Sequence, residues 1–372
     1  MSSPTSPFRI VPRSADIRSQ WDELVRSSPD GWAWGLYDWQ DVALSYERLG
    51  LQDRGFALAS PAGLVAVMPL HVIPAERRLA SSGFGVAGPM LVPGLSERHR
   101  RKILRAVFDA VLDIARNEKC VAIEVGSSPV CPSSLQSQWG VNPFLEFGFR
   151  NVSEVTRVVD LRDETPSLFA ALSDDAKQKI KRAEQLGFSA SRVSWPDMLD
   201  DYYRIHCETY RRTGAVPHDR SYFEGIATMM AAGGTAQLWA AFAPDGKPVA
   251  FHNDAVFNHA SYYHTGCSDT AALDAGANYL LFWRAILGAK EDGCSWYEIG
   301  HVFPGVANGK QRGLTVFKSK FGGKSHWHFL GRIDLETDIE KSPVQQMGLR
   351  SSVEQWLIAS GNLLRTMLSY RR

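Results

Sequence analysis

Apolar and polar positions alternate in blocks that predict strands and helices in a repeating order. In the second half, three apolar-rich stretches with a P-D-G-K turn between the first two predict a meander of strands. A long apolar stretch then predicts a buried helix, and W-Y-E-I a buried strand. The expected elements of this half are, in order, strand 188–195, helices 196–212 and 220–231, strands 235–242, 248–257 and 260–266, helix 278–292, strand 295–299, a short helix 315–321 and strand 326–334.

The first half shows the same order less clearly. The expected elements are strand 8–12, helices 14–25 and 39–46, a β-hairpin within 54–73, an amphipathic helix 97–118, strand 120–125, a Pro-bounded helical region and strand 154–161. E-F-G-F at 146–149 falls where S-K-F-G-G falls at 319–323. An offset of roughly 180 residues is too long for a solenoid and predicts a duplicated domain. A helix at 167–187 would link the halves, and an amphipathic helix at 344–370 would follow the second.

Length and composition fit two ordinary globular domains, which we place at 1–163 and 164–372. The chain has 372 residues, of which 44% are hydrophobic and 22% charged. Lys and Arg number 41 against 40 acidic residues, so any anion binding must come from local clusters. Five scattered cysteines without a C-x-x-C pair predict reduced thiols. The absence of a signal-like segment or an apolar run of about 20 residues predicts a cytoplasmic protein without a membrane span.

The stretch 294–323 concentrates candidate chemistry. A short strand leads into a Gly-rich connection that carries Lys310, Arg312, Lys318 and Lys320. Cationic groups beside such a connection suit an anionic ligand, although a solvated basic loop would have the same composition.

The β-α-α-β-β-β-α-β-α-β order is similar to that of the GNAT acyltransferase fold, and two copies in tandem resemble the FemAB-like branch of that superfamily. The matching pieces are D-D-A-K-Q-K-I-K-R-A-E-Q-L-G-F at 174–188, D-G-K-P-V-A-F at 245–251, S-Y-Y-H-T-G-C-S-D at 261–269, N-Y-L-L-F-W-R-A-I at 278–286, and W-Y-E-I-G at 296–300 with F-K-S-K-F-G-G at 317–323; in the first half, L-A-S-S-G-F-G-V-A-G-P at 79–89 matches. The fold class expected is a mixed α/β fold with two tandem GNAT-like domains, the first a scaffold and acceptor wall, the second holding the cleft.

The resemblance implies transfer of an acyl group to an amine, forming an amide. Family members use an aminoacyl-tRNA donor, in peptide-bridge or natural-product synthesis, or an acyl-CoA donor. In the tRNA-dependent members a Phe-Lys pair lies in the site, and here that pair is Phe317 and Lys318. The Lys is thought to steady the negative charge of the tetrahedral intermediate. The acceptor expected is an amine of a small metabolite or cell-envelope precursor.

The proton acceptor stays open. Glu298 lies mid-strand, where an unpaired carboxylate would be costly to bury, so an ion pair and a catalytic role are both possible. His264 and Tyr263 fall on opposite faces of their strand, one of which should face the cleft. Asp254, His252 and Asp269 are further candidates, and the substrate itself could supply the base.

The segment 268–278 bears on the donor. It holds one glycine, no Gln or Arg, and two carboxylates, which would repel the pyrophosphate of CoA. We therefore favour aminoacyl-tRNA over acyl-CoA, and expect no cofactor and no metal, because the ten histidines show no ligand spacing. The alternatives are an acyl-CoA-dependent N-acyltransferase of exopolysaccharide or lipid metabolism and a catalytically inactive binding protein of the same fold. The donor-binding residues expected are Lys177, Lys181, Arg182, Arg211, Lys310, Arg312, Lys320, Gly322 and Asn278.

Overall fold

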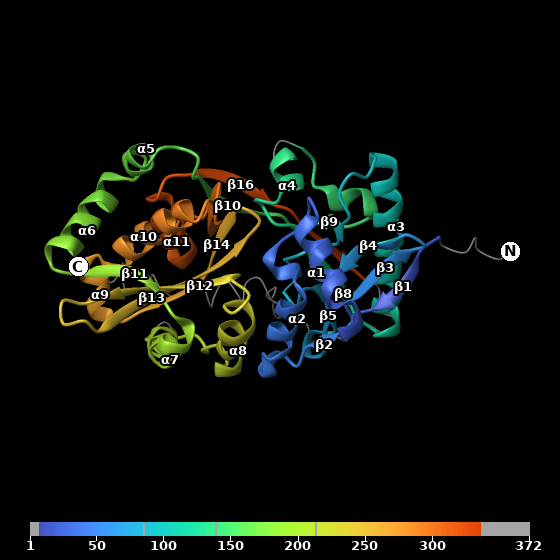
Figure 1. The fold of residues 1–372 in the computed structure, drawn as a ribbon, viewed down its shortest axis with the longest axis horizontal. Coiled ribbons are helices and arrows are strands. Elements are labelled where there is room, and N and C mark those ends of the chain that lie inside the picture. Colours follow the sequence, from blue (N-terminus) through green and yellow to red (C-terminus); the bar gives the residue numbers. More distant parts are fainter. Residues whose placement is uncertain (1–6, 85, 138–139, 213, 336–372) are drawn as a thin grey trace. The chain divides into compact units, whose positions relative to one another are not determined.

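The chain forms two compact units, described by a computed structural model for residues 7–84, 86–137, 140–212 and 214–335 (Figure 1). Of the described residues, the first unit contains those up to Ser153 and the stretch 328–335, and the second contains Glu154–Trp327. The sequence-based division after residue 163 differs from this one in two respects. The contacts place the break ten residues earlier (163 − 153), and they return the last described strand to the first unit.

One seven-stranded sheet forms the second unit. Its strands lie in the order β11 (Ser189–Val193), β12 (Ala236–Phe242), β13 (Pro248–Phe257), β14 (Ala260–Ser268), β15 (Trp296–Val302), β10 (Glu154–Asp160) and β16 (Lys324–His328). Its helices are α5 (Thr165–Ala170), α6 (Asp174–Gln185), α7 (Trp195–Arg212), α8 (Arg220–Gly225), α9 (Thr270–Ala275), α10 (Ala277–Glu291) and α11 (Gly309–Ser319), with a π-helical turn, η6 (Ile226–Met230), after α8. Helices α10 and α11 lie on one side of the sheet, and α7 and α8 on the other (Figure 1).

Strands β14 and β15 run parallel and separate after a short pairing. Their last paired residues are Tyr262 and Glu298, although β14 continues to Ser268 and β15 to Val302. A bulge in β14 also shifts its register against β13, because Asn253 pairs with Thr265 and Asp254 with Tyr263. The extra residue, His264, increases the local twist. The sheet therefore opens between β14 and β15, next to α10 and α11.

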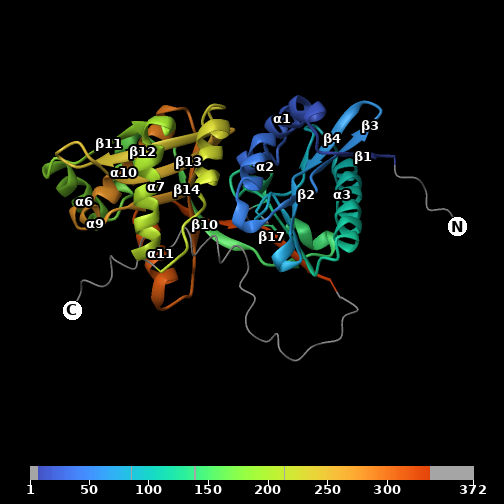
Figure 2. The same cartoon turned by 90° about the horizontal axis from the view of Figure 1, so that it is seen from below.

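Two smaller sheets form the first unit. One has the order β1 (Arg9–Pro12), β3 (Phe56–Ser60), β4 (Gly63–Met68) and β7 (Met90–Leu91), and the other the order β2 (Gln52–Asp53), β5 (Leu70–Ile73), β6 (Arg78–Ser81), β8 (Ala122–Gly126), β17 (Leu330–Asp334) and β9 (Arg150–Asn151). The helices are α1 (Arg18–Ser27), α2 (Tyr37–Leu44), α3 (Glu97–Asn117) and the short α4 (Pro132–Gln136), followed by a 3₁₀ turn, η5 (Pro143–Phe147). Helix α3 runs along one side of the sheets, and α1 and α2 along the other (Figure 2).

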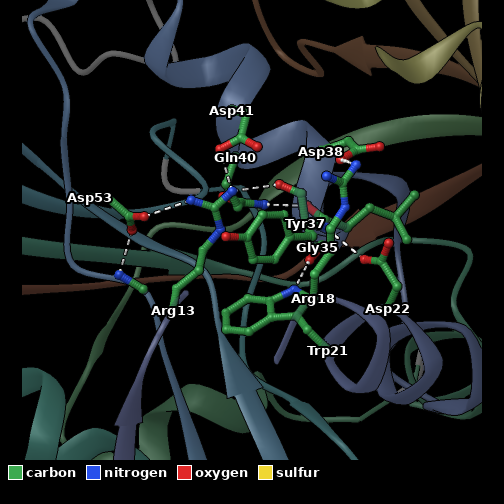
Figure 3. A network of polar contacts seen from close by, with 12 residues as sticks. Arg13, Arg18, Trp21, Asp22, Gly35, Tyr37, Asp38, Gln40, Asp41 and Asp53 are labelled. Carbon is green, nitrogen blue, oxygen red and sulfur yellow. Dashed lines mark hydrogen bonds and ion pairs between the residues drawn. The ribbon is translucent and has the colours of Figure 1, made fainter. Parts of the chain in front are cut away.

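Arg13 connects the N-terminal elements of the first unit (Figure 3). Its guanidinium donates to Asp53 at 2.7 Å and to the carbonyl of Tyr37 at 2.9 Å, and also pairs with Asp41. It stacks 3.7 Å from the centre of the Tyr37 ring, and its side chain is only 4% exposed. The two Nη groups of this buried Arg bind two carboxylates and a carbonyl, so Arg13 fixes β2 and α2 against the end of β1.

The chain crosses twice between the units. After β9, strand β10 enters the sheet of the second unit between β15 and β16, and after β16, strand β17 enters the sheet of the first unit between β8 and β9. The expectation that 154–161 closes the first half is therefore wrong. The predicted strand 326–334 is likewise two strands, one in each unit, since the chain changes sheets at Phe329.

The mixed α/β class and the tandem order are confirmed, and most other elements lie within a few residues of their expected bounds. The predicted linker helix 167–187 is two helices, because α5 ends at Ala170 and Ser173 caps the start of α6 by accepting from the amide of Ala176. The predicted C-terminal helix lies outside the described residues. Within the described part of the chain, no helix is long and apolar enough to cross a membrane.

Candidate active site in the second unit

Lys318 lies buried where β14 and β15 separate. It belongs to the last turn of α11, is 5% exposed, and donates from Nζ to the carbonyl of His301 at 2.9 Å. Its Nζ also lies 5.9 Å from the centre of the Tyr263 ring. Burial lowers the pKa of the Lys318 ammonium to about 8, although the charges of Glu298 and Glu154 raise it. The side chain is therefore still mainly cationic at neutral pH.

Gly300 makes room for this ammonium. A Cβ at Gly300 would lie 2.8 Å from Nζ of Lys318, and the residue has φ of +94°, which favours glycine. The register between β10 and β15 shifts at this point, so that Arg157 pairs with Gly300 and Val158 with Glu298. The final glycine of W-Y-E-I-G is thus what allows the Lys of F-K-S-K-F-G-G to reach the strand.

Glu298 is buried on the same strand and interacts electrostatically with Lys318. Its Oε1 accepts from the hydroxyl of Thr156 on β10 at 2.8 Å. Burial raises the pKa of Glu298 to about 7, while Thr156 and Lys318 lower it. A carboxyl group with a pKa near 7 beside an ammonium with a pKa near 8 suits exchange of a proton at neutral pH.

Aromatic rings hold α11 in place. Phe317 is 7% exposed and packs against Tyr279 and Phe282 of α10 and against Phe321, with ring centres 5.2 to 5.8 Å apart. It therefore anchors the turn that carries Lys318. Tyr263 packs on the same side of the sheet, 4.1 Å from the ring of His252 on β13.

His264 faces the other side of the sheet. Its Nε2 lies 3.0 Å from the hydroxyl of Tyr222 on α8, and its Nδ1 lies 3.3 Å from the amide nitrogen of Asn253. Burial lowers the pKa of His264 to about 3. The structure therefore groups Tyr263 and Glu298 with Lys318, and groups His264 with α7 and α8.

The expected donor-binding residues are distributed over several elements. Lys181 and Arg182 are exposed on α6, where Lys177 pairs with Asp174 at 3.3 Å. The remaining basic residues lie at the end of α7 (Arg211) and in the first turn of α11 (Lys310, Arg312).

Three of the expected donor residues have defined structural partners. Lys320 donates to Asp175 at 2.6 Å and to the hydroxyl of Tyr279 at 3.1 Å, joining α11 to α6 and α10. The carbonyl of Gly322 accepts from Arg157 at 2.7 Å. Asn278 is buried at the start of α10 and donates to the hydroxyl of Ser268 at 3.2 Å.

Helix α6 packs closely against the start of α10. Gly276 precedes α10, and a Cβ there would lie 2.6 Å from the carbonyl of Lys179. The segment between β14 and α10 forms the short helix α9, and Asp269 accepts from the amide of Ala272 at its beginning. One of the two carboxylates noticed in the sequence thus caps a helix. In the described part of the chain, no group of three His, Cys, Asp or Glu side chains is arranged to hold a metal ion.

The class of the protein follows from this geometry and from comparison with known families. Residues 172–312 match the acetyltransferase (GNAT) domain family. A search of characterised protein sequences gives no match. The match thus lies within the second unit, where Lys318, Glu298 and Tyr263 lie at the point where the sheet opens.

Solved structures with a similar fold cover nearly the whole chain. FemX is 17% identical, with a TM-score of 0.67, over 88% of this chain and 97% of its own. The C-terminal domain of a putative lysylphosphatidylglycerol synthetase from Agrobacterium fabrum is 16% identical (TM-score 0.54; 86% and 91% covered). A tandem GNAT protein from the clavulanic acid biosynthesis pathway is 12% identical (TM-score 0.51; 89% and 100%). The expected fold of two GNAT-like domains in tandem is confirmed, and it is similar to the fold of FemX.

Sequence reasoning missed Thr156, Glu154 and Arg157, which reach the second unit on β10. Oε2 of Glu154 lies 3.2 Å from Nε2 of His301, and Arg157 binds the carbonyls of both Gly322 and Gly323. Their only sequence signal was polar residues alternating within a strand assigned to the other half.

Proposed function

We propose that the second unit transfers an aminoacyl group from aminoacyl-tRNA to an amine of a small metabolite or cell-envelope precursor. The observation that carries this proposal is the buried Lys318 ammonium, held between Gly300 and the carbonyl of His301 where β14 and β15 separate. A fixed cation in a site that excludes water stabilises an oxyanion far more than one in solution.

The reaction assigns one role to each group. The acceptor amine attacks the ester carbonyl carbon, a C–N bond forms, and the carbonyl electron pair moves onto oxygen beside Lys318. Glu298 takes the proton that the attacking nitrogen releases. Collapse of the intermediate breaks the C–O bond, and the leaving ribose hydroxyl receives that proton. Phe317 and Tyr263 position Lys318 without exchanging protons.

The start of α10 supports a tRNA donor over CoA. In a CoA-dependent GNAT enzyme the loop before this helix would hold the pyrophosphate, and here the carbonyl of Lys179 lies against Gly276. A carbonyl oxygen in that place repels an anion and blocks its approach. The exposed residues of α6, by contrast, offer positive charge to a phosphate backbone. The name of one similar structure, a putative lysylphosphatidylglycerol synthetase, agrees with aminoacyl chemistry.

A donor test with the purified full chain addresses this proposal. Binding of total tRNA charged with labelled amino acids, and of a panel of acyl-CoAs, is measured at two salt concentrations. We expect retention of one charged tRNA that weakens steeply with salt. Reversing three α6 charges to Glu should abolish retention, whereas reversing three exposed basic residues elsewhere should not. The α6 set is Lys177, Lys181 and Arg182, and the control set is Arg9, Lys247 and Lys324.

The other outcomes are equally informative. Binding of acyl-CoA alone would contradict the tRNA proposal and favour an acyl-CoA-dependent N-acyltransferase. Binding without turnover, unchanged in Lys318→Met, would favour an inactive member that only binds its ligand.

A further inference from the structure

The first unit contains a cavity of about 350 Å³. Its floor is aromatic, formed by Phe108, Phe144, Phe147 and Phe329. Its polar wall includes Asp30, Arg100 and a series of serines. This volume is in the range of cavities that bind small molecules, and the combination of an apolar floor with a few polar groups is typical of them.

The cavity occupies the position that the Lys318 site has in the second unit. In β8, Glu124 is the last residue that pairs in parallel with β6, and Gly126 follows two residues later at the cavity wall. In β15, Glu298 is likewise the last residue that pairs in parallel with β14, and Gly300 follows two residues later. The strands diverge at the same point in both units.

The residue at the position of Lys318 is apolar in the first unit. E-F-G-F at 146–149 aligns with K-F-G-G at 320–323, and Gly148 and Gly322 both have positive φ, 86° and 76°. Counting back two residues places Phe144 opposite Lys318. Phe144 is 6% exposed and lines the cavity. The cavity therefore has no ammonium that could stabilise an oxyanion, and we expect it to bind a ligand without catalysing a reaction.

An ion pair marks its polar wall. Arg100, in the first turn of α3, donates from both Nη atoms to the two oxygens of Asp30 at 2.7 Å, and Ser133 donates to Asp30 at 2.7 Å. Asp30 is 9% exposed and the Arg100 side chain 27%. The pair occupies two of the five N–H donors of Arg100 and leaves the others for a ligand.

We propose that this cavity binds a zwitterionic α-amino acid with an apolar side chain. The ligand carboxylate would pair with the remaining donors of Arg100, and its ammonium with the carboxylates of Asp30 and Glu97, which also lines the cavity. The apolar side chain would lie against the four phenylalanines. Because the wall contains both signs of charge, neither a purely anionic nor a purely cationic molecule can satisfy it.

Calorimetric titration of the full chain tests the proposal. L-phenylalanine and L-leucine should each bind once per chain, whereas L-phenylalaninamide, without the carboxylate, and 3-phenylpropanoate, without the ammonium, should bind at least about tenfold more weakly. Leu104→Trp fills the cavity without touching its charges and should abolish binding. Arg98→Gln, an exposed Arg on the same helix, is the matched control. Asp30→Asn with Arg100→Gln removes both charges together and should also abolish binding.

Two results would overturn this site: no heat with any amino acid, or equal binding of the zwitterions and their truncated analogues. Unchanged binding in Leu104→Trp would also exclude the cavity. The inference is independent of the proposed transfer activity. Lys318→Met should lose transfer and keep amino-acid binding, so the two proposals can fail separately.

Discussion

The two units carry the same Glu-x-Gly sequence on equivalent strands, β8 and β15, but the Glu has different partners in each unit. Glu124 in the first unit pairs with Arg78 and with Arg332, the latter at 2.5 Å. Glu298 in the second unit has a hydroxyl partner, Thr156, and the single ammonium of Lys318 nearby. A buried carboxylate with two guanidinium partners is neutralised permanently, whereas one with a hydroxyl keeps a pKa near the working pH. The same motif therefore forms a buried ion-pair cluster in one unit, and in our proposal it accepts a proton in the other.

The largest expected effect concerns Lys318. Lys318→Met should lower the transfer rate by about a thousandfold, since it removes the cation that faces the oxyanion. It should leave the free energy of unfolding at pH 7 unchanged or higher, because the variant no longer buries a charge whose pKa is held at about 8. Single-turnover kinetics and denaturant unfolding measure the two effects. Lys324→Met, at an exposed position, is the control, and a variant that lost activity by unfolding would contradict the assignment.

Glu298→Gln should lower the rate by about a hundredfold, within the range of general base catalysis. In the native protein, kcat/KM should rise with pH up to about 7, as Glu298 loses its proton, and fall above about 8, as Lys318 loses its own. The variant should lack the rise near pH 7. A rise that persists in Glu298→Gln would assign it to another group, such as the substrate amine.

The corresponding substitution in the first unit, Glu124→Gln, should lower stability and leave the transfer rate nearly unchanged. Glu124→Gln removes the buried carboxylate that Arg78 and Arg332 share, and leaves Arg78, whose side chain is 3% exposed, with Glu76 as its remaining carboxylate partner. We expect a loss of about 3 kcal/mol in the free energy of unfolding with little change in rate per folded molecule. Denaturant unfolding with active-site titration separates these quantities. A hundredfold loss of rate without loss of stability would place catalysis in both units.

The smallest expected effect is a loss of stability in acid that both units share. Burial lowers the pKa of His71 in the first unit to about 4 and that of His264 in the second to about 3. Below pH 6.5 both histidines bind a proton in the unfolded chain but stay neutral in the folded chain. The free energy of unfolding is therefore highest above pH 6.5 and declines as the pH falls. At pH 5 each histidine should cost about 2 kcal/mol. Hydrogen exchange at pH 7 and pH 5 should show loss of protection around both, and His71→Gln should restore protection only around β5.

Local pattern predicted the elements well where neighbouring residues determine them. Strand β13 has the predicted bounds, because apolar residues occupy both of its ends and the P-D-G-K turn precedes it. The predicted strand 326–334 failed, since nothing in its composition tells which sheet each end will join. Which sheet a strand joins depends on its pairing with residues that are more than a hundred positions away in the sequence.

The candidate site was predictable in part. The resemblance led to Lys318, but K-S-K reads as a surface segment, and its burial depends on Gly300 and on the aromatic anchor Phe317. The environment of Glu298 depends on Thr156, which the sequence assigned to the other half. His264, a candidate proton acceptor, lies on the opposite side of the sheet from Lys318, where the β14 bulge and Tyr222 hold it.

The exchange of β10 and β17 also constrains how the chain folds during synthesis. Within the described sheet of the first unit, β9 is joined only through β17, which is made about 180 residues later. While the ribosome is still translating the second half, β8 therefore has an unpaired edge. The N-terminal half should emerge as a partly formed, protease-sensitive intermediate, and a fragment ending at residue 163 should stay in that state. The long sequence separation of these contacts makes closure of both sheets a late and slow event.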